Sequence, residues 1–121
     1  MNEDLFMDKE IPISHILETR ARDFCATLGV DIDTNWFVVA AGLSAIAESF
    51  HIRPDTFGLD SIFFSDLKPS FLHEIDGVEM VLSIEKKTGR FMDPNSARLL
   101  AQIYRKSVAD WLKLLIKSKW K

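Results

Sequence analysis

Hydrophobic residues recur every three or four positions along most of the chain, a spacing that places them on one face of a helix. The first such stretch runs from about Ile13 to Leu28, after a polar segment, residues 1–12, that we expect to fray. The second runs from about Asn35 to Phe50, with Asp33 or Thr34 as its N-cap. Because this second stretch is apolar around much of its circumference, we expect it to be the central helix of an all-α fold.

The clearest helix signal lies between Ile75 and Gly89. Acidic residues crowd its first turns, and Lys86 and Lys87 occupy its last turn, so each sign of charge stands where the helix dipole favours it. Gly89 supplies a left-handed stop. The pattern predicts a helix from about His73 to Thr88. Its predicted buried face consists of Ile75, Val78, Val81, Leu82 and Ile84.

A long connection, residues 51–72, separates the second and third helices. Pro54 and Pro69 exclude one continuous helix through it. Many of its residues are nevertheless large and apolar, so we expect the connection to pack against the core, with a short helical turn from Ser61 to Leu67.

The last part of the chain opens a helix at Asp93, an N-cap that is followed by Pro94 in the first helical position. Helical spacing of apolar residues then continues almost to the end of the sequence. Two arrangements fit this pattern: one long helix, or a break followed by a new helix that Ser107 and Asp110 open.

The 121 residues are enough for one domain with one hydrophobic core. The single cysteine, Cys25, excludes an internal disulfide and a multi-cysteine zinc site. It lies on the apolar stripe of the first helix, so we expect a buried structural thiol and not a nucleophile. We see no signal-peptide pattern, and the longest apolar run, Trp36 to Leu43, is too short to span a bilayer. We therefore expect a cytoplasmic protein.

The net charge of −3 is unevenly divided. Residues 1–85 contain 16 acidic and 5 basic side chains, whereas residues 86–121 contain 2 acidic and 10 basic ones. One interpretation is that the two halves attract each other within the fold. The other is that the lysine-rich end, with Trp111 and Trp120, meets an acidic partner, an anionic membrane surface or nucleic acid. The overall acidity argues against nucleic acid.

The sequence offers little for catalysis. It has no His or Cys cluster with metal-ligand spacing, no glycine-rich phosphate loop and no nucleophile elbow. His51 and His73 flank the long connection near several carboxylates and form one conceivable acid–base pair. We expect a protein that is not an enzyme and binds no metal.

Three segments, taken in order, resemble acyl carrier proteins. The segment IAESFHIRPDTFGLDSIFFSDL, residues 46–67, is similar to the end of the family's first helix and the loop before its prosthetic site. The segment VEMVLSIEKKTG, residues 78–89, is similar to the family's VELVMALEEEFG and is the most specific of the three. The segment SVADWL, residues 107–112, is similar to the opening of the family's last helix. The resemblance runs from Val38 to Leu115.

The resemblance implies a carrier-like helical bundle over residues 35–121, one compact unit, with residues 1–34 as an extension that carries one amphipathic helix. In this family a serine in an Asp-Ser-Leu triplet begins the second helix and carries 4′-phosphopantetheine through a phosphodiester, which suits a helix N-terminus. Alignment on VEMVLSIE places His73, Glu74 and Ile75 at this triplet, so the hydroxyl is missing. We therefore expect no prosthetic group.

Two nearby serines offer an alternative, in which the protein is a functional carrier of acyl or peptidyl groups with 4′-phosphopantetheine on Ser61 or Ser70. Ser61 lies in GLDSI, residues 58–62, a close copy of the triplet, but Pro69 would then fall inside the helix that must follow. Ser70 is displaced by an insertion and lacks the preceding aspartate.

The sequence thus predicts a non-enzymatic, degenerate carrier-like module that acts through protein–protein interaction. Members of the family present an acidic helix to basic patches on their partners. The resemblance implies that the contacts to such a partner are Glu74, Asp76, Glu79 and Glu85.

Overall fold

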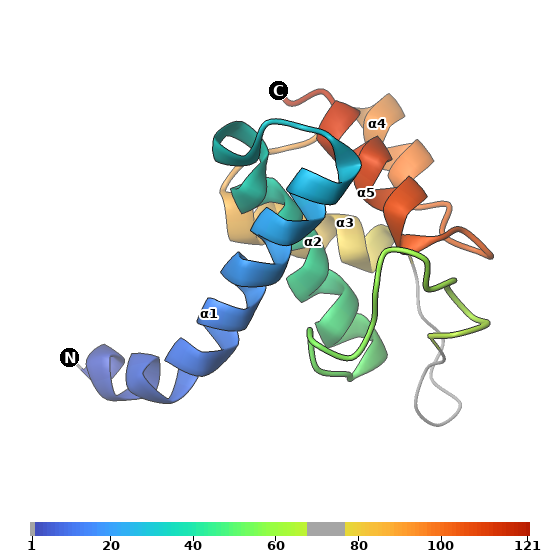
Figure 1. Ribbon diagram of the computed structural model, residues 1–121. Helices are drawn as coiled ribbons and strands as arrows, with labels where there is room; N and C mark the ends of the chain where they lie inside the picture. The colour runs from blue at the N-terminus through green and yellow to red at the C-terminus, as the bar shows by residue number, and fades with distance from the viewer. Residues whose placement is uncertain (1, 68–76) are drawn as a thin grey trace.

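The computed structural model describes residues 2–67 and 77–121, and the side chains of the first helix from residue 15 onward (Figure 1). These two ranges form five helices: α1 (Asn2–Leu28), α2 (Ile32–Phe50), α3 (Gly77–Thr88), α4 (Pro94–Leu100) and α5 (Val108–Lys117). They contain no strand, and β-type pairing is confined to isolated bridges. The predicted all-α fold class is confirmed.

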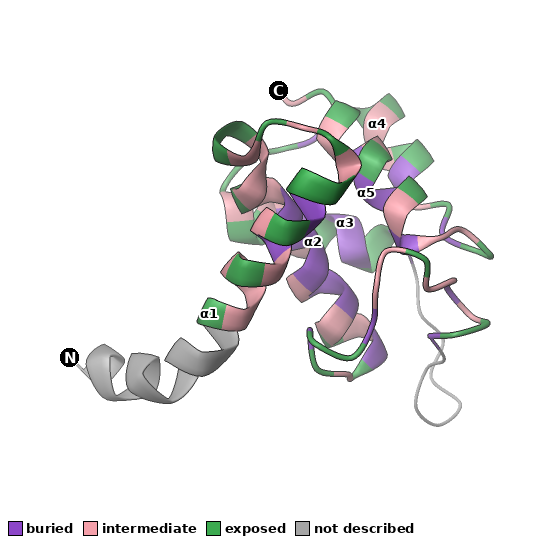
Figure 2. Cartoon of the chain, in the orientation of Figure 1, coloured by how far each residue is buried: buried purple, intermediate pink, exposed green. Residues whose placement is uncertain are grey.

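α2 is the centre of the bundle. It packs against α1, α3 and α5. Its buried residues are Val39, Ala41, Gly42, Leu43, Ala45, Ile46 and Phe50. Figure 2 shows buried residues gathered where α2, α3 and α5 face one another. The central position that the broad apolar surface of this helix predicts is confirmed.

α2 begins three residues earlier than the pattern indicates. Asp31 has an extended backbone, and its Oδ2 accepts a hydrogen bond from the Thr34 N–H at 2.8 Å. Asp31 is therefore the N-cap, and the prediction of Asp33 or Thr34 was wrong because both residues already lie inside the helix.

α1 begins at Asn2, so the segment that we expected to fray is helical. The helix continues through Pro12, although the proline nitrogen cannot donate the backbone hydrogen bond of a helix interior. The residues that α1 buries are Ala21, Phe24 and Cys25. The expected buried thiol is thus confirmed, and α1 contributes to the same core as the rest of the bundle.

In the described residues no single helix is long and apolar enough to cross a membrane. α1 from His15 onward and α2 meet that test only as a pair, with a bend of 120° between them.

The connection that follows α2 packs against the core, as expected. Its buried side chains include Phe57, Phe63 and Leu67. Arg20 of α1 donates a hydrogen bond to the Phe57 carbonyl and fixes the connection to the bundle. In place of the expected helical turn there is a hydrogen-bonded turn, in which the Ile62 carbonyl accepts from the N–H groups of residues 65–67. It is not helical because Phe64, inside the turn, adopts a φ of +68°.

The C-terminal apolar stretch forms two helices. Asp93 Oδ2 accepts a hydrogen bond from the Asn95 N–H at 3.1 Å, with Pro94 in the first helical position, as predicted. α4 then ends at Leu100. Ser107 Oγ opens α5 by accepting from the N–H of residue 110 at 3.1 Å. The alternative with a break is therefore confirmed, and one long helix is excluded.

Trp111 joins these two helices. Its side chain is fully buried, and its Nε1 donates to the Leu100 carbonyl at 2.8 Å. Its ring meets that of Phe63 edge-on, with 5.9 Å between centroids. The prediction that Trp111 belongs to an exposed basic surface was wrong, because the apolar face of α5 turns it into the core.

Candidate interaction surface on α3 and the adjoining cleft

α3 carries apolar side chains on its outer face. Val78 is 50% exposed and Leu82 is 56% exposed. They stand four residues apart and therefore one above the other on the helix. The prediction that both are buried was wrong. The face that α3 turns inward consists of Gly77, Met80, Val81 and Ile84.

The register of α3 is fixed by its contacts with α2. Ser83 Oγ donates to Glu48 Oε1 at 3.1 Å, and Lys87 Nζ donates to Glu48 Oε2 at 2.7 Å. These two bonds hold one flank of α3 against α2. Val78 and Leu82 lie on the opposite flank, so they remain in solvent.

The acidic residues of α3 differ in their surroundings. Glu79 is exposed, and within the described ranges its carboxylate has no ion pair or hydrogen bond. Glu85 is half-buried, and its Oε2 accepts a hydrogen bond from the Met92 N–H at 2.8 Å. Glu79 is thus the predicted contact residue whose charge is available to a partner. Glu74 and Asp76 lie outside the described residues.

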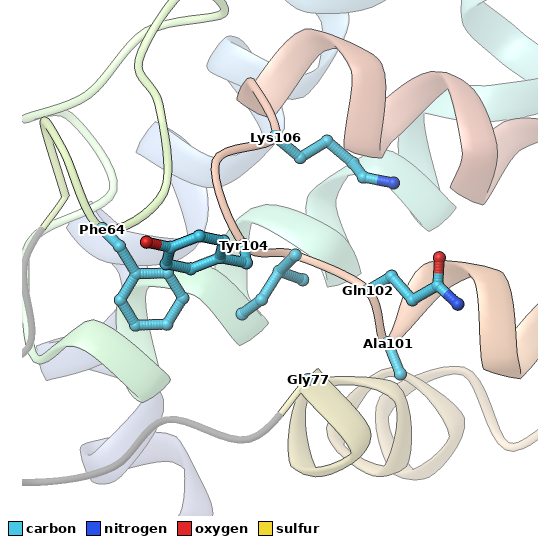
Figure 3. A pocket seen from close by; sticks show the side chains of 7 residues that line it. Phe64, Gly77, Ala101, Gln102, Tyr104 and Lys106 are labelled. Atoms are coloured by element: carbon cyan, nitrogen blue, oxygen red, sulfur yellow. The ribbon is translucent and has the colours of Figure 1, made fainter.

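A cleft of about 530 Å³ opens beside the start of α3 (Figure 3). Its lining consists of Phe64, Gly77, Ala101, Gln102, Ile103, Tyr104 and Lys106. Figure 3 shows the rings of Phe64 and Tyr104 side by side at one end, and their centroids are 5.9 Å apart. The cleft combines an aromatic wall with the amide of Gln102 and the ammonium of Lys106, a lining that suits ligand binding.

Two residues at this cleft have left-handed backbone conformations. Phe64 has a φ of +68° and Arg105 a φ of +60°. Such conformations cost about 1–3 kcal/mol in residues other than glycine and persist where the surroundings enforce them. Here the Phe64 N–H donates to the Leu67 carbonyl at 2.7 Å, and the Phe63 N–H donates to the Lys106 carbonyl at 3.0 Å. These bonds hold the aromatic wall in place.

Ser61 does not begin a helix. Its Oγ accepts a hydrogen bond from the Gly58 N–H at 3.0 Å, and its carbonyl accepts from the Val108 N–H of α5 at 2.8 Å. The Ala109 N–H donates to the Leu59 carbonyl at 2.8 Å. The N–H groups of Val108 and Ala109 at the start of α5, the helix next to Ser61, are therefore already hydrogen-bonded to carbonyls of this protein. They are not free to bind a phosphate on Ser61, as the N–H groups of a helix N-terminus would be under the resemblance. Ser70 lies outside the described residues.

The described residues contain no group of three or more His, Cys, Asp and Glu side chains that could hold a metal ion. Burial raises the pKa of the Cys25 thiol above its ordinary value, which opposes its use as a nucleophile. His51 is exposed at the end of α2, and the predicted second member of that acid–base pair, His73, lies outside the described ranges.

The sequence pattern did not identify the aromatic wall. Tyr104 is one of the apolar positions that keep helical spacing after Asp93, and the structure leaves this side chain 72% exposed. The signal for exposure was the pair Arg105-Lys106 directly before the Ser107 cap, since two cations ahead of a new helix indicate a solvated turn.

No protein-family model matches the sequence, and comparisons with curated proteins and with solved structures give no significant match.

Proposed function

We propose that this protein is a non-enzymatic, carrier-like interaction module without a prosthetic group, and that it binds a protein partner through the outer face of α3. The observation that carries this proposal is the exposure of Val78 and Leu82 one turn apart, beside the unpaired carboxylate of Glu79.

An exposed apolar pair on a well-anchored helix favours association. α3 is held by its buried face and by the two bonds to Glu48, so a partner that docks on it loses little conformational freedom in this protein. Burying Val78 and Leu82 supplies the apolar contact. Glu79 adds a charge that favours partners with a basic patch and speeds their approach.

The acyl-carrier resemblance supports the same surface. In that family the helix that follows the prosthetic serine meets partner proteins, and here α3 occupies the corresponding segment. Glu74 stands where the family has its serine, which is the basis for proposing a module that has lost the prosthetic group.

Intact mass separates this proposal from the alternative of a working carrier. The purified protein is incubated with coenzyme A and a broad-specificity phosphopantetheinyl transferase, with a normal acyl carrier protein as a positive control. We expect no mass gain. A gain of one phosphopantetheine that disappears in Ser61→Ala or Ser70→Ala would contradict the proposal and identify a functional carrier.

Binding variants test the surface itself. We expect partner proteins to be retained by the immobilised wild-type protein, and to be lost with Leu82→Ser and with Glu79→Lys. Asp60→Lys is the matched control, because it makes the same charge reversal on an exposed acid outside α3. Loss in all three variants, or in none, would show that α3 is not the interface.

A further inference from the structure

The basic residues of the C-terminal part are largely free of carboxylate partners. Of the ten in residues 86–121, only Lys87 forms an ion pair within the described ranges, with Glu48 at 2.7 Å. Attraction between the acidic and the basic half of the chain is thus visible, within the described ranges, as one ion pair. Apart from that pair, no carboxylate of the described residues neutralises these cations.

Residues 91–93 pair with residues 119–121, and this pairing fixes the position of two lysines. Met92 and Trp120 form an isolated antiparallel bridge. The Lys121 N–H donates to the Phe91 carbonyl at 2.8 Å, and the Asp93 N–H donates to the Lys119 carbonyl at 2.8 Å. The end of the chain is thereby fixed beside the segment between α3 and α4.

The register of this pairing decides which side chains face outward. Side chains alternate along an extended segment, and directly opposed residues point to the same side. Met92 is buried and Trp120 is half-buried, so this pair faces the core. Phe91, Asp93, Lys119 and Lys121 consequently lie on the other side. Asp93 is half-buried there, and its carboxylate accepts from the first N–H groups of α4. The other three are exposed, and we name Phe91, Lys119 and Lys121 the Phe91 face. Phe91 is 68% exposed.

Further contacts make the Phe91 face rigid. The Lys119 N–H donates to Ser96 Oγ at 3.0 Å, which attaches it to the first turns of α4. The guanidinium of Arg90 lies over the Trp120 ring, 4.9 Å from its centre. Lys113 and Lys117, exposed and four residues apart on α5, extend the positive charge beyond this face.

We propose that the Phe91 face binds an anionic lipid surface, with Lys119 and Lys121 against the headgroups and the Phe91 ring in the interfacial layer. Clustered lysines are attracted to the negative potential of such a surface, and an exposed apolar ring between them gains from leaving water. This inference concerns a different surface from α3 and does not rest on the function proposed for α3.

Two observations favour a lipid surface over other anionic partners. The Phe91 face is an outward strip, and neither the cleft beside α3 nor a second cleft between α1 and α2 includes its residues, so a flat partner fits better than a small anion. Binding of single-stranded nucleic acid uses successive exposed rings as stacking platforms. On the described part of this face Phe91 is the one exposed ring, since Trp120 is half-buried and lies on the other side with Met92.

Cosedimentation of the full chain with vesicles tests this proposal. The probes are vesicles of phosphatidylcholine alone and vesicles of equal phosphatidylcholine and phosphatidylserine. We expect binding to the second kind only, weakening as salt is added because the attraction is screened. Lys119→Gln and Lys121→Gln should each lower the partition coefficient about fivefold. Phe91→Ser should weaken binding and leave its salt dependence unchanged.

Lys106→Gln is the matched control. It removes the same charge at the opposite end of α5, a helix of ten residues and so about 15 Å long. We expect it to change binding less than Lys119→Gln does. Equal losses in the two variants would indicate unspecific charge attraction and overturn the proposal. It would also be overturned by an absence of binding at low salt, or by binding of a single-stranded oligonucleotide but not of vesicles.

Discussion

Gly77, the first residue of α3, lies directly against the carbonyl of Ala101 at the end of α4. A Cβ at Gly77 would overlap the Ala101 oxygen and lie 2.6 Å from its carbonyl carbon. At the other end of α3, Glu85 Oε2 accepts from the Met92 N–H, just before α4 begins. The two helices are therefore antiparallel neighbours that touch through backbone at one end and through a side chain at the other. This close approach positions both the outer face of α3 and the cleft beside it.

We expect Gly77→Ala to lower the free energy of unfolding by about 3 kcal/mol, because the added methyl group meets backbone that cannot move aside. Urea denaturation measures this change. Gly58→Ala is the control, since a Cβ there meets only Asp60 Oδ1, at 3.4 Å, and should change stability by less than about 1 kcal/mol. Similar effects of the two substitutions would contradict the close contact.

Trp111→Phe should destabilise the protein by about 2–3 kcal/mol. The substitution leaves the buried Leu100 carbonyl without its donor and opens a cavity beneath α4. Thermal unfolding followed by circular dichroism measures the loss. Trp120→Phe provides the comparison at a half-buried tryptophan and should cost about 1 kcal/mol or less. If Trp111→Phe is as mild as Trp120→Phe, the hydrogen bond to Leu100 is not a significant link between α4 and α5.

Local chemistry in the sequence was sufficient to predict most helix ends. The caps Asp93, with Pro94 after it, and Ser107 can be recognised from two to four residues of sequence, and both residues are N-caps in the structure. Gly89 has a φ of +70°, as a left-handed stop requires. The start of α2 was misplaced because Asp31 and Asp33 are both acceptable caps, and only the backbone of the folded chain selects Asp31.

The orientation of α3 could not be obtained in the same way. Val78, Met80, Val81 and Leu82 are all apolar, so more than one face of this helix satisfies the spacing rule. Tertiary packing makes the choice: Met80 and Val81 are buried, and Glu48 of α2 holds the flank that carries Ser83 and Lys87. The exposed pair that carries the proposed function is therefore a result of tertiary packing. The same holds for the cleft, whose aromatic wall joins the distant residues Phe64 and Tyr104.

Cys25 should react with a thiol reagent only when the protein unfolds. Its side chain has no exposed surface, and burial raises the pKa of the thiol, so both access and thiolate content are low in the folded state. The rate of reaction with an aromatic disulfide, measured with and without urea, checks this. Rapid stoichiometric labelling of the native protein would contradict the burial of Cys25 between α1 and the core.

Asp31→Asn should reveal how the cap of α2 depends on pH. Hydrogen bonds from the side chain and then the backbone N–H of Thr34 hold the pKa of the Asp31 carboxyl below its ordinary value of 3.8. The folded state therefore binds this proton more weakly than the unfolded state does. The stabilisation from the charge is present above a pH of about 3.8 and is lost as the pH falls through the folded pKa.

Asparagine keeps the acceptor for the Thr34 N–H but cannot ionise. We thus expect wild type to melt at a higher temperature than Asp31→Asn at a pH of about 6, and this difference to shrink as the pH falls through the folded pKa. Asp31→Ala, which loses the acceptor as well, should melt below Asp31→Asn throughout. A difference between wild type and Asp31→Asn that stays constant with pH would show that the charge of Asp31 does not contribute to the cap.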